Sequence, residues 1–306
     1  MLRFHRIAAL CLAATFALVS IGGFVRATKS GLGCGDNWPH CPGEVDRALL
    51  IEMSHRTAAA LVVGLLATLA VFAWRRRTEA PGLVMPSLVA FGLVLFQAVL
   101  GAVVVWLELR AESVILHLAT AMALLVLLVY ITAASSEAAR SRDDLADASL
   151  ARGARLVAAS VLVLLLAGSY VTGRDAGYVF GDWPLMNGRV LPDLSVELYA
   201  IHFLHRALAA IVGVLLFLFC FRVIRGKRER PLLARFAHVA AGSFALEIMV
   251  GAANVWTRLS PAVVTLHLAL GALILASVSG IAIMASPGFA GAAARSRSMR
   301  MEPARA

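Results

Sequence analysis

The sequence predicts an all-α polytopic membrane protein, in which eight transmembrane helices form two tandem, pseudo-two-fold related four-helix bundles. Three observations support this class. Hydrophobic residues make up 60% of the 306 residues and charged residues only 15%, whereas soluble domains are about 45–50% apolar and about 25% charged. Eight apolar runs are long enough to cross a bilayer, and the second half of the chain repeats the first. A chain this apolar has too few polar residues to cover the surface of a soluble protein. It is also too apolar for a disordered protein.

Each predicted helix is an apolar run of about 20 residues, the length that crosses a membrane. We expect these helices at 7–25, 49–74, 82–106, 113–134, 155–172, 198–221, 232–256 and 262–285. The first run has the length of a signal peptide, but no small-residue cleavage site follows it. Its last residues, Gly22–Arg26, also recur in altered form later in the chain. We therefore expect it to remain as a membrane helix.

The two halves share four sequence elements. The matching segments are SHRTAAALVVG at Ser54–Gly64 with LHRALAAIVG at Leu204–Gly213, FQAVLGAVVVW at Phe96–Trp106 with LEIMVGAANVW at Leu246–Trp256, LHLATA at Leu116–Ala121 with LHLALG at Leu266–Gly271, and DNWPHCPG at Asp36–Gly43 with GDWPLMNG at Gly181–Gly188. Four spans per half make this a parallel repeat. We predict a first bundle at 1–138, a cytoplasmic linker at 139–152, a second bundle at 153–286 and a basic cytoplasmic tail at 287–306.

Basic residues indicate which way the chain crosses the membrane. Of the 28 Lys and Arg residues, 19 flank one side of the predicted spans and 7 the other, and the remaining two, Arg56 and Arg206, lie inside spans. Because Lys and Arg are enriched in cytoplasmic loops, both termini are expected in the cytoplasm and the loops at 27–48 and 173–197 outside. The formal charge of +10 is therefore explained by topology in a bacterial plasma membrane, and we expect no nucleic-acid partner.

Two histidine pairs stand at matching places in the halves. His55 and His117 lie in the first half, and His205 and His267 lie in the second, with a spacing of 62 residues in each pair. Ionisable residues inside a membrane indicate function, and two imidazoles facing each other suit the axial positions of a heme iron. Zinc is disfavoured because neither pair has further ligands at this depth. The alternative is that the histidines only hydrogen-bond to neighbouring helices. Without a CxxCH motif, any heme is held non-covalently.

The halves differ beside these histidines. Glu52 precedes His55 by three residues on the same helical face, whereas its counterpart 150 residues later is His202. A carboxylate at only one site favours chemistry in the first half and electron transfer in the second. The alternative for Glu52 is a solvated carboxylate at the membrane interface. We do not expect His202 to be a ligand.

The first external loop carries two cysteines, Cys34 and Cys41, for which an oxidising compartment favours a disulfide. Met186 stands opposite Cys41 in the second loop, so that loop lacks a matching bridge. Arg56 and Arg206 each follow a predicted ligand and are candidates to bind heme propionates. Their alternative role is that of arginines snorkelling to the interface.

GGFVRATKSGLGCGDNWPHCPG at Gly22–Gly43, EMSHR at Glu52–Arg56 and the paired LHLA elements together resemble the heme A synthase family of cytochrome oxidase biogenesis, over about residues 5–285. The resemblance implies an oxidoreductase that converts the C8 methyl of heme O into the formyl group of heme A. It also implies residue roles: a heme b held by His205 and His267, a substrate site at His55 and His117, a functional glutamate at Glu52 and a cysteine pair at Cys34 and Cys41. The second cysteine pair that many bacterial members carry in the third external loop is absent here.

For this activity we expect two successive hydroxylations of the methyl, giving a gem-diol that loses water, with electrons passed through the bis-histidine heme b. Catalytic roles fall to Glu52, which would exchange protons, and to His55 and His117, one of which would be a labile ligand. Expected partners are heme O, the bilayer, a membrane electron donor, heme O synthase and cytochrome oxidase assembly factors. The main alternative is a bis-histidine diheme electron-transfer cytochrome without a heme substrate. A small-solute transporter is disfavoured, because the spans lack paired Gly/Pro interruptions at the midplane.

Overall fold

The computed structural model describes residues 2–42, 44–137, 145–226 and 228–289, and it consists of helices joined by loops. The long helices are α1 (Leu2–Ala27), α2 (Arg47–Arg75), α3 (Val84–Trp106), α4 (Ala111–Ser135), α6 (Ala148–Gly173), α7 (Glu197–Arg225), α8 (Pro231–Trp256) and α9 (Pro261–Met284). Two short 3₁₀ helices, η1 (Pro81–Leu83) and η3 (Ala176–Tyr178), precede α3 and follow α6. All eight long helices are sufficiently long and apolar to cross a membrane, which confirms the eight predicted spans and the all-α membrane class.

Local sequence explains where several helices begin. The carboxylate of Asp46 accepts a hydrogen bond from the amide of Leu49 at the start of α2, and Asp147 accepts one from Leu150 at the start of α6. Such N-caps satisfy amides that have no partner within the helix. Because of its cap, α6 begins at Ala148, inside the segment that was predicted as linker at 139–152. The rest of that linker at 139–144, and most of the predicted tail at 287–306, lie outside the described residues.

The sequence repeat is also a repeat of backbone conformation. The turn from α3 to α4 contains two consecutive residues with positive φ, Glu108 at 51° and Leu109 at 61°. The turn from α8 to α9 has the same pair 150 residues later, Arg258 at 53° and Leu259 at 62°. Left-handed conformations are uncommon outside glycine and asparagine, so two matching pairs indicate that the halves share one local fold and not merely one composition.

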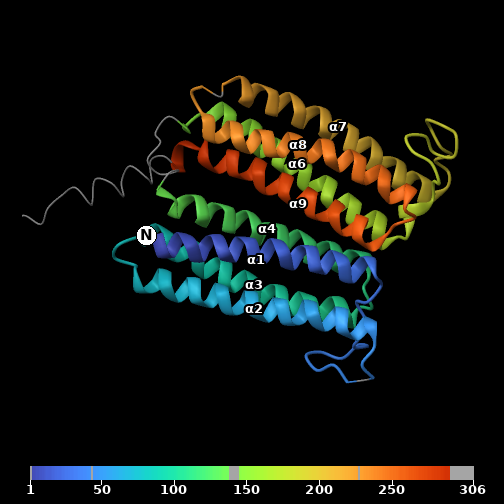
Figure 1. The fold of residues 1–306 in the computed structure, drawn as a ribbon, viewed down its shortest axis with the longest axis horizontal. Helices are drawn as coiled ribbons and strands as arrows, with labels where there is room; N and C mark the ends of the chain where they lie inside the picture. The colour runs from blue at the N-terminus through green and yellow to red at the C-terminus, as the bar shows by residue number, and fades with distance from the viewer. Residues whose placement is uncertain (1, 43, 138–144, 227, 290–306) are drawn as a thin grey trace, which may run out of the picture.

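The helices pack mainly against neighbours in the same half of the chain (Figure 1). In the first half each of the helices α1 to α4 packs against the next one along the chain, and α4 also packs against α1. The helices α6 to α9 repeat this arrangement in the second half. The halves meet where α1 and α4 contact α9 and where α4 contacts α6. Helix α9 is therefore central, with 61% of its most apolar stretch buried, against at most 33% for the other seven.

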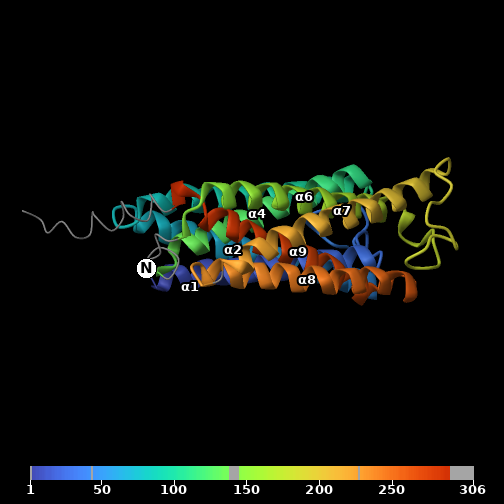
Figure 2. The same ribbon diagram turned by 90° about the horizontal axis from the view of Figure 1, so that it is seen from above.

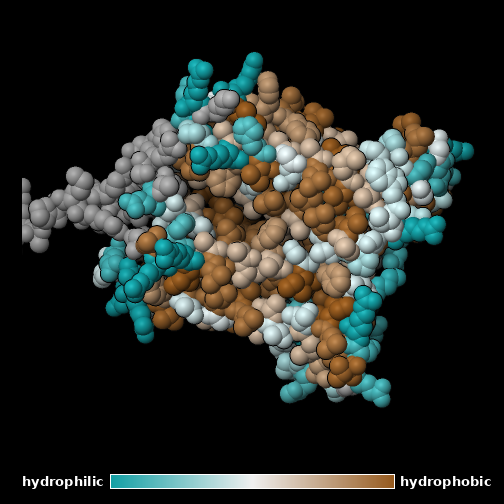
Figure 3. All heavy atoms as spheres, viewed as in Figure 1, coloured by the Kyte–Doolittle hydropathy of each residue, from teal (hydrophilic) through white to brown (hydrophobic). Residues whose placement is uncertain are grey.

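The two long loops lie together at one end of the molecule. Figure 1 and Figure 2 show the loop between α6 and α7 at the end of the bundle opposite to the N-terminus. In Figure 1 the loop between α1 and α2 lies at the same end of the bundle as the loop between α6 and α7. The last turn of α9 lies at the same end as the N-terminus. A hydrophobic band separates two hydrophilic ends on the face shown in Figure 3. This distribution is the one expected of a protein that spans a bilayer.

Candidate functional site

All four predicted ligands lie near the loop end of the helices. His55 and His205 stand eight residues after the first residues of α2 and α7, and His117 and His267 stand six residues after those of α4 and α9. With a rise of 1.5 Å per residue, these distances are about 12 Å and about 9 Å along the helices. The four imidazoles therefore lie at similar depth, below the two long loops.

The histidines are paired within each half. The rings of His55 and His117 are close enough to interact electrostatically, and so are those of His205 and His267. The pairs come from helices that face each other across the bundle, because α2 and α4 both pack against α1 and α3, and α7 and α9 both pack against α6 and α8.

Each imidazole packs against a glycine of a neighbouring helix, and an added Cβ there would contact the Cε1 atom of the ring. The distances are 3.1 Å from Gly22 to His55, 3.6 Å from Gly101 to His117, 3.1 Å from Gly168 to His205 and 3.4 Å from Gly251 to His267. At the 3.1 Å positions, even a methyl group would press on the ring. Four glycines thus let α1, α3, α6 and α8 approach the rings closely. The sequence analysis missed this function, although Gly101 and Gly251 occupy matching places in its second repeated element.

The ring nitrogens have almost no protein partners. The Nδ1 atom of each of the four rings is buried without a hydrogen bond in the described residues. No hydrogen bond to Nε2 of these rings is found in that part of the chain either. Because buried polar atoms normally have partners, paired imidazoles of this kind fit the axial positions of a heme iron. Among the described residues no cluster of three or more His, Cys, Asp or Glu side chains could hold a metal ion, which disfavours zinc.

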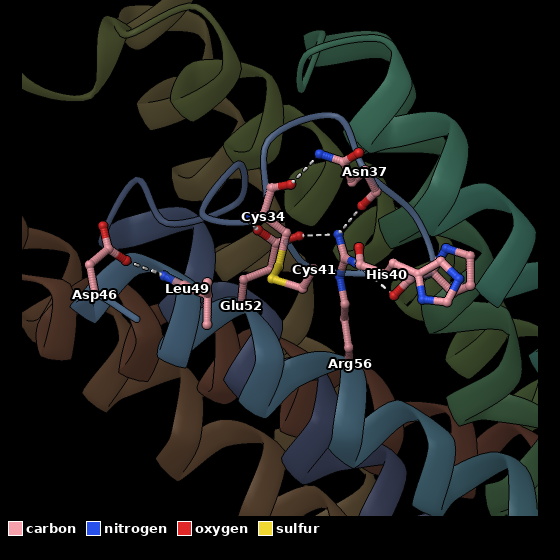
Figure 4. Close-up of a disulfide and its surroundings, with 9 residues drawn as sticks. Cys34, Asn37, His40, Cys41, Asp46, Leu49, Glu52 and Arg56 are labelled. Atoms are coloured by element: carbon pink, nitrogen blue, oxygen red, sulfur yellow. Dashed lines mark hydrogen bonds and ion pairs between the residues drawn. A yellow bond between two sulfur atoms is a disulfide. The ribbon is translucent and has the colours of Figure 1, made fainter. Parts of the chain in front are cut away.

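Glu52 connects α2 to the disulfide in the loop between α1 and α2. Its Oε2 atom accepts a hydrogen bond of 2.9 Å from the amide of Cys34, and its Oε1 atom pairs with the guanidinium of Arg56 at 2.5 Å. Cys34 and Cys41 form the disulfide, as predicted (Figure 4). The structure therefore brings Glu52 together with the loop, and both carboxylate oxygens are engaged there.

The two arginines beside the histidines bind the two long loops, Arg56 the loop between α1 and α2 and Arg206 the loop between α6 and α7. Arg56 donates to the carbonyls of Asn37, Pro39 and His40 at 3.0, 3.3 and 3.4 Å, and Arg206 donates to those of Leu185, Asp182 and Pro184 at 2.9, 3.3 and 3.5 Å. A guanidinium has five N–H donors in a planar fork, so one arginine side chain can bind several backbone carbonyls of a loop at once. This anchoring was not anticipated from the sequence.

His202 takes the place of Glu52 in the second half. Its Nε2 atom accepts a hydrogen bond from Nε of Arg206 at 3.1 Å. Because arginine only donates, Nδ1 carries the proton, and it donates to the carbonyl of Ala176 at 2.9 Å. Glu52 and His202 differ in charge, yet each joins an arginine to the long loop of its own half.

The loop between α6 and α7 is shaped by Asp182. The amides of Gly188 and Asn187 donate to its two carboxylate oxygens at 2.7 and 2.6 Å. These hydrogen bonds, with a smaller contribution from the nearby guanidinium of Arg206, hold the pKa of Asp182 below its ordinary value. The turn that Arg206 binds is therefore also closed on itself by a carboxylate.

One ionisable residue near the second histidine pair was missed by the sequence analysis. The Oε1 atom of Glu247 on α8 lies 3.2 Å from Nδ1 of His267, while its Oε2 atom is buried without a partner in the described residues. Its counterpart is Gln97, whose Nε2 donates to the backbone carbonyl of His117 at 3.0 Å. The signal was a glutamate inside a predicted span, in a repeated element that aligns it with Gln97.

Comparison with known proteins identifies the family of the chain. The family model described as COX15-CtaA, cytochrome oxidase assembly protein, matches residues 5–49 and 44–279. The chain is 28% identical to a heme A synthase of Shouchella clausii over 76% of this chain and 78% of that protein. It is 31% identical to a heme A synthase of Symbiobacterium thermophilum over 76% and 78%, and 26% identical to one of Staphylococcus saprophyticus over 82% and 85%. The chain belongs to the cytochrome oxidase assembly protein family.

Proposed function

We propose that this protein is an oxidoreductase that converts the C8 methyl group of heme O into the formyl group of heme A. The observation that carries this proposal is the pair of imidazoles in each half, whose ring nitrogens make no hydrogen bond in the described residues, with a glycine packed against each ring. Similarity to proteins named heme A synthase supports the same activity. The relatives reported above are all named heme A synthase, which favours this activity over the alternative of a diheme electron-transfer cytochrome.

The two halves have different tasks in this proposal. His205 and His267 hold a resident heme b, and His55 and His117 receive the substrate heme O between α2 and α4. A heme held by these two histidines would supply one-electron transfer. The division is supported by the different side chains beside the fourth helix of each half, Gln97 in the first and Glu247 in the second.

At the proposed substrate site, the protein's own residues position the substrate and the disulfide loop that lies beside it. Glu52, about one helical turn before His55, and Arg56, the residue after it, hold the disulfide loop on α2. A proton-transfer role for Glu52 remains a further prediction, since both of its oxygens bind the loop and Arg56. Propionate binding by Arg56 and Arg206 also stays a prediction, because their guanidinium groups already donate to loop carbonyls.

The proposed setting is a bacterial plasma membrane, with both termini in the cytoplasm and the histidine pairs toward the outer face. The 19 to 7 distribution of basic residues supports this orientation. The disulfide in the loop between α1 and α2 supports it too, since disulfides persist in oxidising compartments. Heme O synthase and cytochrome oxidase assembly factors are the proposed protein partners, beside a membrane electron donor.

Coexpression with a heme O synthase, followed by heme analysis of the purified protein, tests the function. We expect the wild type to yield heme A. His205→Ala and His267→Ala should lose heme b, whereas His55→Ala and His117→Ala should keep heme b but make no heme A. His238→Ala is the matched control, because that ring bonds to the carbonyl of Ala234 in its own helix. Loss of heme b in all four variants would refute the division of tasks, and heme b alone in the wild type under every growth condition would favour the diheme cytochrome.

A further inference from the structure

Glu247 is an acidic side chain within a membrane-spanning helix, where a carboxylate is costly and normally has a function. Its side chain is 15% exposed, and its Oε1 atom lies 3.2 Å from Nδ1 of the His267 ring. This separation is within hydrogen-bond range, but the two atoms are not aligned as a hydrogen bond here. The carboxylate thus lies beside Nδ1 of the ring.

The first half has an amide at this place and uses it differently. Gln97 donates through Nε2 to the backbone carbonyl of His117 and leaves the ring alone, so Nδ1 of His117 has no partner in the described residues. Only in the second half, therefore, does a carboxylate stand beside the histidine of the fourth helix. This is the clearest chemical difference between the two histidine pairs.

A second difference accompanies the first. Gly271 lies one turn after His267, and its counterpart in the first half is Ala121. A methyl group at 271 would lie 2.6 Å from Cδ2 of Leu165 and 3.6 Å from Oε1 of Glu247. Glycine at this position lets α9 approach α6 closely, next to the carboxylate. The glutamate and the glycine together form an arrangement that the first half lacks.

We propose that Glu247 is a positioning residue for His267. The carboxylate accepts the Nδ1–H of the ring, which leaves Nε2 as the nitrogen that faces the iron and makes it a stronger electron donor. A more basic axial ligand stabilises the oxidised iron, so the heme of the second half has a lower midpoint potential than an amide at position 247 would give. This inference rests on the proposed function, in which His205 and His267 hold heme b.

Redox titration of purified Glu247→Gln, followed by its heme absorption bands, tests the inference. Glutamine has nearly the same shape as glutamate. If Glu247 only fills space, the midpoint potential of the heme should therefore be unchanged in Glu247→Gln. We expect a midpoint potential more positive than that of the wild type, a low-spin bis-histidine spectrum as in the wild type, and heme affinity reduced by about tenfold. Gln97→Glu is the matched control in the other half and should leave the potential of heme b unchanged.

The outcomes separate this inference from the proposed function. If His205→Ala and His267→Ala lose heme b but Glu247→Gln keeps the wild-type potential, the inference about Glu247 is wrong and the proposed function stands. If those two histidine variants retain heme b, the proposed ligand set itself is wrong. If Glu247→Gln purifies without heme, Glu247→Asp decides: retention of heme by the shorter carboxylate supports the inference, and loss contradicts it.

Discussion

The backbone amide of Cys34 donates a hydrogen bond of 2.9 Å to Oε2 of Glu52. The disulfide is therefore attached directly to the helix that carries His55. In the second half Arg206 and His202 hold the corresponding loop without a disulfide. The two halves thus use different residues for one purpose, which is to keep a long loop attached near a histidine pair.

Replacing Glu52 tests this attachment. Glu52→Ala leaves the buried amide of Cys34 without an acceptor and Arg56 without its carboxylate, so we expect a loss of about 1–3 kcal/mol in the free energy of unfolding. Denaturant titration of the detergent-solubilised protein measures it. Glu79→Ala is the control, because the Glu79–Arg76 pair is exposed and should contribute below about 1 kcal/mol. Equal losses in the two variants would contradict the anchoring role.

Comparing Glu52→Gln with Glu52→Ala separates anchoring of the loop from proton transfer. Glu52→Gln retains an oxygen that can accept a hydrogen bond from the amide of Cys34, but it removes the carboxylate that would exchange a proton. If Glu52 only anchors the loop, Glu52→Gln should produce heme A faster than Glu52→Ala. If it transfers protons, both should be equally impaired in single-turnover assays. Wild-type rates in Glu52→Ala would exclude both roles.

The glycines that pack against the histidines give a second prediction. At Gly168 an added methyl group would lie 3.1 Å from Cε1 of His205, so Gly168→Ala should displace the ring and lower heme b retention severalfold. Gly242→Ala is the control, because nothing lies within 4 Å of the added atom. Alanine there should slightly stabilise the helix, since glycine costs about 1 kcal/mol in helix interiors. Heme content per protein, measured by the pyridine hemochrome assay, decides. Equal retention in both variants would show that the contact is unimportant.

The loop-binding arginines give a third prediction. Lysine carries one ammonium group and cannot reproduce the planar fork of arginine, so Arg206→Lys should lose the simultaneous bonds to His202, Asp182 and Leu185. We expect faster chymotrypsin cleavage in the loop between α6 and α7. Arg174→Lys is the control, because its pair with Glu197 is largely exposed. A loop as resistant as in the wild type would contradict the anchoring role. A fall in heme content in Arg206→Lys would support the predicted propionate binding.

The end of the molecule opposite the loops gives a pH-dependent prediction. The amide of Leu150, and to a smaller extent Arg230, hold the pKa of Asp147 below its ordinary value of 3.8. Asp147→Ala should cost about 1 kcal/mol of unfolding free energy at neutral pH, as for other helix caps. Because the folded pKa is lowered, this contribution is present above about pH 4 and is lost as the pH falls through the folded value. Thermal unfolding of both proteins from pH 7 to pH 3 measures it. A difference that stays constant over this range would contradict the assignment.

Much of the fold could be predicted because its signals are local. A run of about 20 apolar residues is a membrane helix whatever surrounds it, so all eight helices were found. The start of α6 was misplaced by seven residues, because Ala148–Arg155 contains charged residues and its helical start depends on the cap at Asp147. The 150-residue repeat then identified His55, His117, His205 and His267 without any knowledge of packing.

The sequence by itself determined the number of spans, the duplication, the histidine pairs and the cysteines that form the disulfide. Only the tertiary structure decided what Glu52, Arg56, Arg206 and Glu247 bind. These side chains lie on helices that are apolar on all sides, so no hydrophobic stripe shows which face turns inward. The rotation of each helix about its axis is set by packing against its neighbours, including the close approaches at Gly168 and Gly271. That rotation turned Glu52 and Arg56 toward the loop and Glu247 toward His267. It thereby added a second chemical difference between the halves, at position 247, to the one that the sequence shows at position 52.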